Sequence, residues 1–109
     1  MQWGFLNGSP NANGHTAKLD AYLLTDQPTT TWSLVDAHIA QLGQHQHIED
    51  DFDAIAAEIA SVDALLIGTP VYWSDMTGLL KTFLDRCTLV AKTYDFSNIP
   101  TYLLIDGTQ

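Results

Sequence analysis

Short apolar runs recur along the chain and alternate with longer segments of mixed character. Four of these runs are rich in apolar or β-branched residues and predict strands, at residues 3–6, 29–35, 64–68 and 102–105. The run at 64–68 contains no polar side chain, which is typical of a strand covered on both faces. The pattern therefore favours a sheet that is buried between two layers.

Helical spacing marks the segments between the predicted strands. The first helix is expected at residues 16–24, the second begins at Asp50 or Asp51, and the third follows a loop that ends at Met76. Strands that alternate with helices predict βαβ units, and hence a parallel sheet in a single domain spanning residues 1–109. The inner faces of the second and third helices repeat at i, i+3, i+4 and i+7, with Phe52, Ile55, Ala56 and Ile59 in one and Leu80, Phe83, Leu84 and Cys87 in the other.

Loops at the carboxyl ends of the predicted strands are the candidate binding segments, because open parallel sheets bind ligands there. The first such loop, GSPNANGHT, precedes a helix, where free backbone N–H groups and the helix dipole favour an anion. Ser9 and Thr16 offer hydroxyl donors, and Asn11, Asn13 and His15 offer side-chain N–H donors. This loop could hold a phosphate without Lys or Arg, or form an ordinary strand-to-helix turn with an Asn cap.

A nucleoside-triphosphate site is a competing interpretation of the same loop. The P-loop has four residues between its glycines and then a Lys. Here Gly8 and Gly14 have five residues between them, and His15 stands in the place of that Lys. Without the Lys, a γ-phosphate loses its main cationic partner, so NTPase activity is not expected.

Composition and charge exclude several partners. The 109 residues include 13 acidic and four basic side chains, for a formal net charge of −9. An acidic surface suits neither nucleic acid nor an anionic membrane, so neither partner is expected. Cys87 is the only cysteine, which excludes an intrachain disulfide and, in an apolar helical run, is typical of a core residue. No apolar run approaches the ~20 residues of a membrane span, and we expect a cytoplasmic protein.

Two of these segments resemble those of a known family. The stretch DALLIGTPVYWSDMTGLLKTFLDR, residues 63–86, closely resembles the flavin-loop segment of the NAD(P)H-dependent FMN reductases and flavodoxin-like quinone reductases. GSPNANGHT resembles their phosphate loop, and Asp50-Asp51-Phe52 resembles the acidic pair that opens a helix in many members. The resemblance implies an α/β, flavodoxin-like fold of three layers. Its parallel strands would follow the order 2-1-3-4, with the usual fifth strand absent.

The resemblance also places the ring of FMN against the second loop. Apolar and aromatic side chains suit the flat faces of a flavin, and successive backbone N–H groups suit its polar edge. Tyr72 and Trp73 would flank or stack on the ring, although such a pair also occurs in cores and subunit interfaces. The implied ring-binding residues are Pro70, Val71, Tyr72, Trp73, Ser74, Asp75 and Met76, with Gly107 and Thr108 of a third loop behind them.

Departures from the family's pattern limit what can be carried over. Ser74 and Asp75 stand where many relatives carry Gly, Trp or Asn, and a carboxylate near the ring would disfavour an anionic reduced flavin. His45 and His47 stand in place of the cysteine-rich segment of some relatives, so no iron–sulfur cluster is expected. Two histidines alone are more typical of a solvated loop than of a metal site, and no metal is expected.

The activity that the resemblance implies is hydride transfer from NAD(P)H through bound FMN to a quinone, a flavin or a similar small acceptor. Because the cofactor carries this chemistry, no dedicated catalytic residue is expected. A truncated, non-catalytic domain that serves as an oligomeric or partner-binding module is the main alternative. Electron transfer without NAD(P)H, as in flavodoxins, is a third hypothesis.

The end of the sequence bears on assembly. The family's fold continues past the fourth strand, whereas this sequence ends at Gln109. Residues 102–105 would then form an edge strand that is poorly covered on at least one face. Because exposed apolar edges usually pair with something, we expect a homo-oligomer, most simply a dimer. Strand swapping and truncation of a longer gene are the alternatives.

Overall fold

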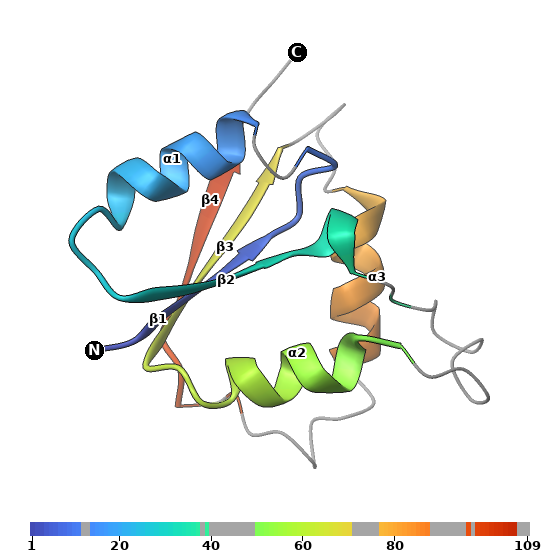
Figure 1. Ribbon diagram of the computed structural model, residues 1–109. Coiled ribbons are helices and arrows are strands. Elements are labelled where there is room, and N and C mark those ends of the chain that lie inside the picture. Colours follow the sequence, from blue (N-terminus) through green and yellow to red (C-terminus); the bar gives the residue numbers. More distant parts are fainter. Residues whose placement is uncertain are drawn as a thin grey trace.

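A four-stranded parallel sheet forms the centre of the computed structural model, in the order β2-β1-β3-β4 (Figure 1). The structure describes residues 1–11, 14–37, 39, 50–70, 77–87, 96 and 98–106. The strands are β1 (Trp3–Asn7), β2 (Thr29–Ser33), β3 (Ala64–Pro70) and β4 (Thr101–Asp106). The helices are α1 (His15–Leu23), α2 (Phe52–Ile59) and α3 (Gly78–Cys87), with a 3-10 turn η1 (Leu34–Asp36) after β2. The strand order and direction confirm the prediction.

Helices cover both faces of the sheet, with α1 on one side and α2 and α3 on the other (Figure 1). Residues that are register partners in parallel strands share a face, so Phe5, Leu66 and Tyr102 lie together. A Cβ at Gly68 would lie 2.7 Å from Phe5 and 2.8 Å from Thr16 of α1, which places α1 on this face. The three-layer arrangement that the sequence predicts is therefore present.

The main hydrophobic core lies between the sheet and the pair α2 and α3. The rings of Phe52 and Phe83 lie 5.1 Å apart and join the two helices at its centre. Both predicted apolar helix faces point into this core, as their spacing requires. Its buried members include Leu6, Trp32, Leu34, Phe52, Ile55, Ala56, Ile59, Val62, Leu65, Leu80 and Phe83.

Two predicted strand ends are wrong by two residues each. β2 stops at Ser33 rather than Val35, because η1 turns the chain and buries Leu34 in the core while Val35 stays exposed. β3 continues through Pro70, two residues beyond the predicted end, because β4 extends far enough to pair Pro70 with Asp106. Tertiary pairing decides both ends, and local composition did not contain that information.

The acidic pair before α2 has a role beyond starting the helix. Asp51 is the N-cap residue but makes no side-chain capping bond, whereas Asp50 Oδ1 accepts from the N–H of Phe52 at 3.0 Å. The other oxygen of Asp50 accepts from Arg86 Nη1 of α3 at 2.6 Å, and both side chains are buried. The Arg86 guanidinium also lies 4.6 Å from the centre of the Phe52 ring. This buried ion pair therefore fastens the start of α2 to the end of α3.

Within the part of the chain that the structure describes, no helix is both long and apolar enough to cross a membrane.

Candidate functional site

The carboxyl ends of β1, β3 and β4 meet at one edge of the sheet. Asn7, the last residue of β1, is the register partner of Gly68 in β3, and Pro70 at the end of β3 is the partner of Asp106 at the end of β4. The chain that leaves each of these strands therefore starts from the same edge, with the N-terminus of α1 beside it (Figure 1). This is the place where open parallel sheets bind their ligands.

Side chains of the first loop fix its backbone through a series of short turns. The buried Asn7 accepts from the N–H of Ser9 through Oδ1 at 2.9 Å, and Ser9 Oγ accepts from the N–H of Asn11 at 3.1 Å. The N–H of Gly14 then donates to the carbonyl of Asn11 at 3.1 Å. Because these amides are engaged within the loop, the backbone donors that remain at this point among the described residues are those of the first turn of α1.

The N-terminus of α1 is open to an anion. Its N-cap residue is Gly14, no side chain among the described residues caps it, and its first turn contains no acidic residue. The N–H groups of residues 15–17 have no acceptor inside the helix, and the helix dipole makes this end positive. Such a helix end is suited to a phosphate group.

Two glycines allow the backbone segments at this edge to approach one another. The N–H of Gly8 donates to the carbonyl of Gly68 at 2.8 Å, which ties the first loop to β3. Thr16 is buried with its methyl group over Gly68, where an added Cβ would lie 2.8 Å away. At Gly8, an added Cβ would lie 3.0 Å from Leu80 of α3. Side chains at either glycine would push α1 or α3 away from the sheet edge.

Thr77 connects the first loop to α3, and sequence reasoning missed it. Its Oγ1 donates to the carbonyl of Gly8 at 2.6 Å and accepts from the N–H of Leu80 at 3.2 Å. The second contact is a helix N-cap, and a Thr just before an apolar helical run is the signal that could have revealed it. Asn7 was missed in the same way, although Asn two residues before Ser9 is a turn signature.

The predicted site residues fall into two groups. Ser9, Thr16 and Pro70 are buried at this edge, whereas Asn11 is exposed. His15 is the first residue of α1, and its side chain lies outside the described part. Also outside the described residues are Asn13, Val71, Tyr72, Trp73, Ser74, Asp75, Met76, Gly107 and Thr108. The structure therefore describes Ser9, Asn11, Thr16 and Pro70, and their binding of FMN, like that of the other residues, stays a prediction.

Among the described residues, burial raises the pKa of two titratable groups, Cys87 at the end of α3 and Asp20 on α1. Burial raises the pKa of the Cys87 thiol to about 11, so the thiol stays protonated at neutral pH. Cys87 also packs against the hydrophobic core, which confirms its prediction as a core residue. Burial likewise raises the pKa of Asp20 on α1. His45 and His47 lie outside the described part, within which no group of three or more His, Cys, Asp or Glu could hold a metal ion.

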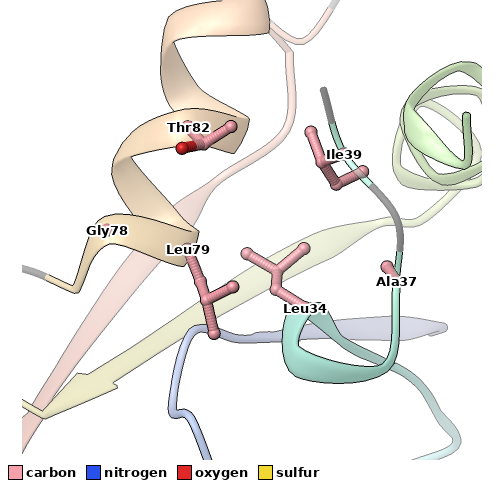
Figure 2. Close-up of a pocket in the computed structure, with 6 residues that line it drawn as sticks. All are labelled: Leu34, Ala37, Ile39, Gly78, Leu79 and Thr82. Atoms are coloured by element: carbon pink, nitrogen blue, oxygen red, sulfur yellow. The ribbon is translucent and has the colours of Figure 1, made fainter. Parts of the chain in front are cut away.

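A cavity of about 210 Å³ lies between the start of α3 and Leu34, Ala37 and Ile39, which follow β2. Figure 2 shows Leu34 and Leu79 extending toward each other, with Thr82 on the next turn of α3 and Ile39 across the gap. The side chains that line the cavity are apolar apart from that of Thr82, and it contains none of the predicted site residues. The cavity is therefore separate from the predicted phosphate-binding residues.

Comparison with known proteins assigns the family. The family described as NADPH-dependent FMN reductase matches residues 1–107. The chain belongs to this family. It is 32% identical over 94 residues to YwqN of Bacillus subtilis, which is named as an NAD(P)H-dependent FMN-containing oxidoreductase; the match covers 79% of this chain and 51% of YwqN.

Solved structures of this FMN reductase-like kind share its fold. The Trp repressor binding protein from Bacillus subtilis superposes with a TM-score of 0.74 at 26% identity, over 94% of this chain and 66% of that one. FerB from Paracoccus denitrificans, a flavoenzyme NAD(P)H:(acceptor) oxidoreductase, superposes with a TM-score of 0.74 at 18% identity, over 95% of this chain and 59% of FerB. The chain thus has the flavodoxin-like fold but spans only about half of YwqN.

Proposed function

We propose that this protein binds FMN and acts as an NAD(P)H-dependent oxidoreductase. The observation that carries the proposal is the N-terminus of α1, which no described side chain caps and which lies over Gly68 at the edge where three strands of an FMN reductase-family sheet end. A phosphate with a flat, largely apolar ring attached is a ligand that this edge can accommodate. The described residues at this edge therefore suit the phosphate of the group that the family name implies, and the family resemblance supports the ring contacts.

The first loop is proposed to hold the phosphate of FMN. The N–H groups at the start of α1 supply the backbone donors, and the hydroxyls of Ser9 and Thr16 lie next to them in sequence. Asn11, Asn13 and His15 are proposed to add side-chain N–H donors. With no acid in the first turn of α1, no like charge opposes the phosphate there.

The second and third loops are proposed to hold the ring. Pro70 ends β3 next to Asp106 of β4, so residues 71 and 107 both continue from this pair. The proposed ring contacts, carried by the family resemblance, are Pro70, Val71, Tyr72, Trp73, Ser74, Asp75, Met76, Gly107 and Thr108.

FMN, when bound, supplies the hydride chemistry, and the protein's part is to bind and orient it. The proposed donor is NADPH or NADH, and the proposed acceptor is a quinone, a flavin or a similar small molecule. Nothing in this scheme needs an acid, base or nucleophile from the chain, in keeping with the protonated thiol of Cys87. Since NAD(P)H is the donor, a cytoplasmic location is part of the proposal.

Reconstitution with FMN tests the proposal. The purified protein should turn yellow and bind FMN with a micromolar or lower Kd by flavin-fluorescence titration, and it should oxidise NADPH when a quinone is present. Thr16→Val keeps the packing over Gly68 but removes the hydroxyl, and should raise the Kd for FMN roughly tenfold. Thr31→Val, at an exposed position of β2, is the matched control. A protein that fails to bind FMN at all would overturn the proposal.

A non-catalytic, partner-binding domain is the second candidate, favoured by the exposure of β4. Tyr102, Leu103 and Ile105 are 54%, 60% and 55% exposed, so apolar side chains face solvent on both sides of this outer strand. We propose that a second copy of the chain covers this surface in a homodimer. A dimer that binds FMN without oxidising NAD(P)H would favour the non-catalytic candidate over the enzyme.

A further inference from the structure

We infer that Thr77 is a positioning residue that aligns the phosphate-binding loop with α3 and thereby raises the affinity for the phosphate of FMN. The inference rests on the proposed function, since it concerns the affinity for FMN. Its basis is a single buried hydroxyl that bonds at once to the first loop and to the start of α3, which are 69 residues apart from Gly8 to Thr77 in sequence.

Thr77 and Asn7 together bond both ends of one peptide unit in the first loop, the unit between Gly8 and Ser9. The carbonyl of Gly8 accepts from Thr77 Oγ1 at 2.6 Å. The N–H of the same planar unit belongs to Ser9 and donates to Asn7 Oδ1 at 2.9 Å. The N–H of Gly8, one unit earlier, donates to Gly68 of β3. With both ends of the unit bonded, the direction in which Ser9 leaves the strand is set by Thr77 and Asn7 together.

The same oxygen sets the start of α3. Thr77 Oγ1 accepts from the N–H of Leu80, so the first turn of α3 is held at the distance from Gly8 that one hydroxyl allows. The first loop and α3 are closely packed at this point, because a Cβ at Gly8 would lie 3.0 Å from Leu80 Cβ. The hydroxyl therefore fixes the first turn of α3 relative to the loop that follows β1.

A helix cap alone would not need this geometry. Capping uses only the acceptor lone pairs of a Thr, and the hydroxyl hydrogen is then free to point to solvent. Here Thr77 is buried and its hydrogen is committed to a carbonyl of another segment. The bond that Thr77 donates to Gly8 therefore positions the first loop, and the bond that it accepts from Leu80 caps α3.

The experiment compares FMN with riboflavin, which has the same ring but no phosphate. In Thr77→Ala, loss of the bond to Gly8 should raise the Kd for FMN about tenfold, because a buried carbonyl loses its donor and the phosphate loop loses its alignment with α3. The Kd for riboflavin should change less than about threefold, since only one half of the site is used. Thr77→Ser keeps the hydroxyl and should restore FMN binding to near that of the unaltered chain.

Thr25→Ala is the matched control for a lost Thr hydroxyl at a helix end. Thr25 Oγ1 donates to the carbonyl of Ala21 at 2.7 Å at the end of α1, at an exposed position. This variant should lower the melting temperature slightly and leave both Kd values unchanged. If Thr77→Ala does not fold, Gly8→Ala replaces it, because its added Cβ forces the loop away from Leu80 with the hydroxyl intact. The same selective loss of FMN affinity is expected.

The outcomes separate this inference from the function on which it rests. Selective weakening of FMN with rescue by Ser supports the positioning role. A Thr77→Ala protein that is less stable but binds FMN as well as the unaltered chain would overturn the inference and leave the proposed function standing. Equal weakening of FMN and riboflavin would also overturn it, because general damage to the fold explains that result. If the unaltered chain binds no FMN, both proposals fail together.

Discussion

Asp20 carries the one side-chain oxygen, among the described residues, that is buried without a hydrogen-bond partner. The atom is Oδ1, and it lies on α1 one turn after Thr16, on the side that approaches the sheet. Burial disfavours the charged form, so the pKa of this carboxyl is raised above its ordinary value of 3.8. An ionised Asp20 therefore lowers the stability of the folded state near neutral pH.

Replacing this carboxylate tests that interpretation. Because the pKa in the folded state exceeds that in the unfolded state, the folded protein holds the proton more tightly, and stability falls as pH rises through the two values. Asp20→Asn should therefore raise the melting temperature at pH 7, and the gain should vanish below about pH 3.8. The control Asp26→Asn changes the net charge equally at an exposed turn. An equal gain from both variants would assign the effect to net charge and contradict the prediction.

Helices α2 and α3 are joined by a buried charge pair in addition to their apolar contacts. Arg86 lies in the last turn of α3 and pairs with Asp50, which precedes α2. The Arg86 guanidinium also lies over the ring of Phe52. The exposed pair Lys81–Asp85 on the same helix has an N–O distance of 3.7 Å and lies in solvent. Since water screens the second pair but not the first, the two should differ strongly in their effect on stability.

Removing one partner of each pair measures this difference. Arg86→Ala leaves Asp50 charged and buried, and should lower the free energy of unfolding by about 3–5 kcal/mol. Lys81→Ala should change it by less than about 1 kcal/mol. Both values come from urea denaturation at pH 7. In a double-mutant cycle, Asp50→Asn should recover part of the loss caused by Arg86→Ala. Strictly additive effects would contradict a direct interaction between the two side chains.

These elements also show what sequence alone can predict. The helices and strands follow from apolar periodicity, a local property, and the strand order came from resemblance to a family; both agree with the structure. The bonds from Arg86 to Asp50 and from Thr77 to Gly8 join residues 36 and 69 positions apart. Such pairs depend on how elements meet, which periodicity does not encode. For the same reason, Ser9 and Thr16 could be proposed as ligands, while the Thr77 bond that aligns their loop could not.

At the scale of the whole molecule, the two outer strands differ in how they meet solvent. β2 has Thr and Ser at four of its five positions, whereas three apolar residues of β4, Tyr102, Leu103 and Ile105, are more than half exposed. On the α1 face, Tyr102 contacts the ring of Trp3 at 5.6 Å, beside an open apolar hollow of about 480 Å³. The uncovered surface therefore gathers around β4, as the sequence predicts for a strand left at the edge of the sheet.

Charge and salt provide the sharpest test of the proposed dimer. Each chain has a net charge of −9, so two copies repel one another, and association through apolar surface should strengthen as salt rises from 0.05 to about 0.5 M. Light scattering should show a dimer at micromolar concentration, and Leu103→Lys with Ile105→Lys should yield a monomer, since charges on an edge strand oppose pairing. Val35→Lys, next to the opposite edge of the sheet, controls for an added charge at an exposed apolar position. If the unaltered chain is a monomer at high salt, β4 is not a self-association surface; if both variants dissociate alike, the contact lies elsewhere.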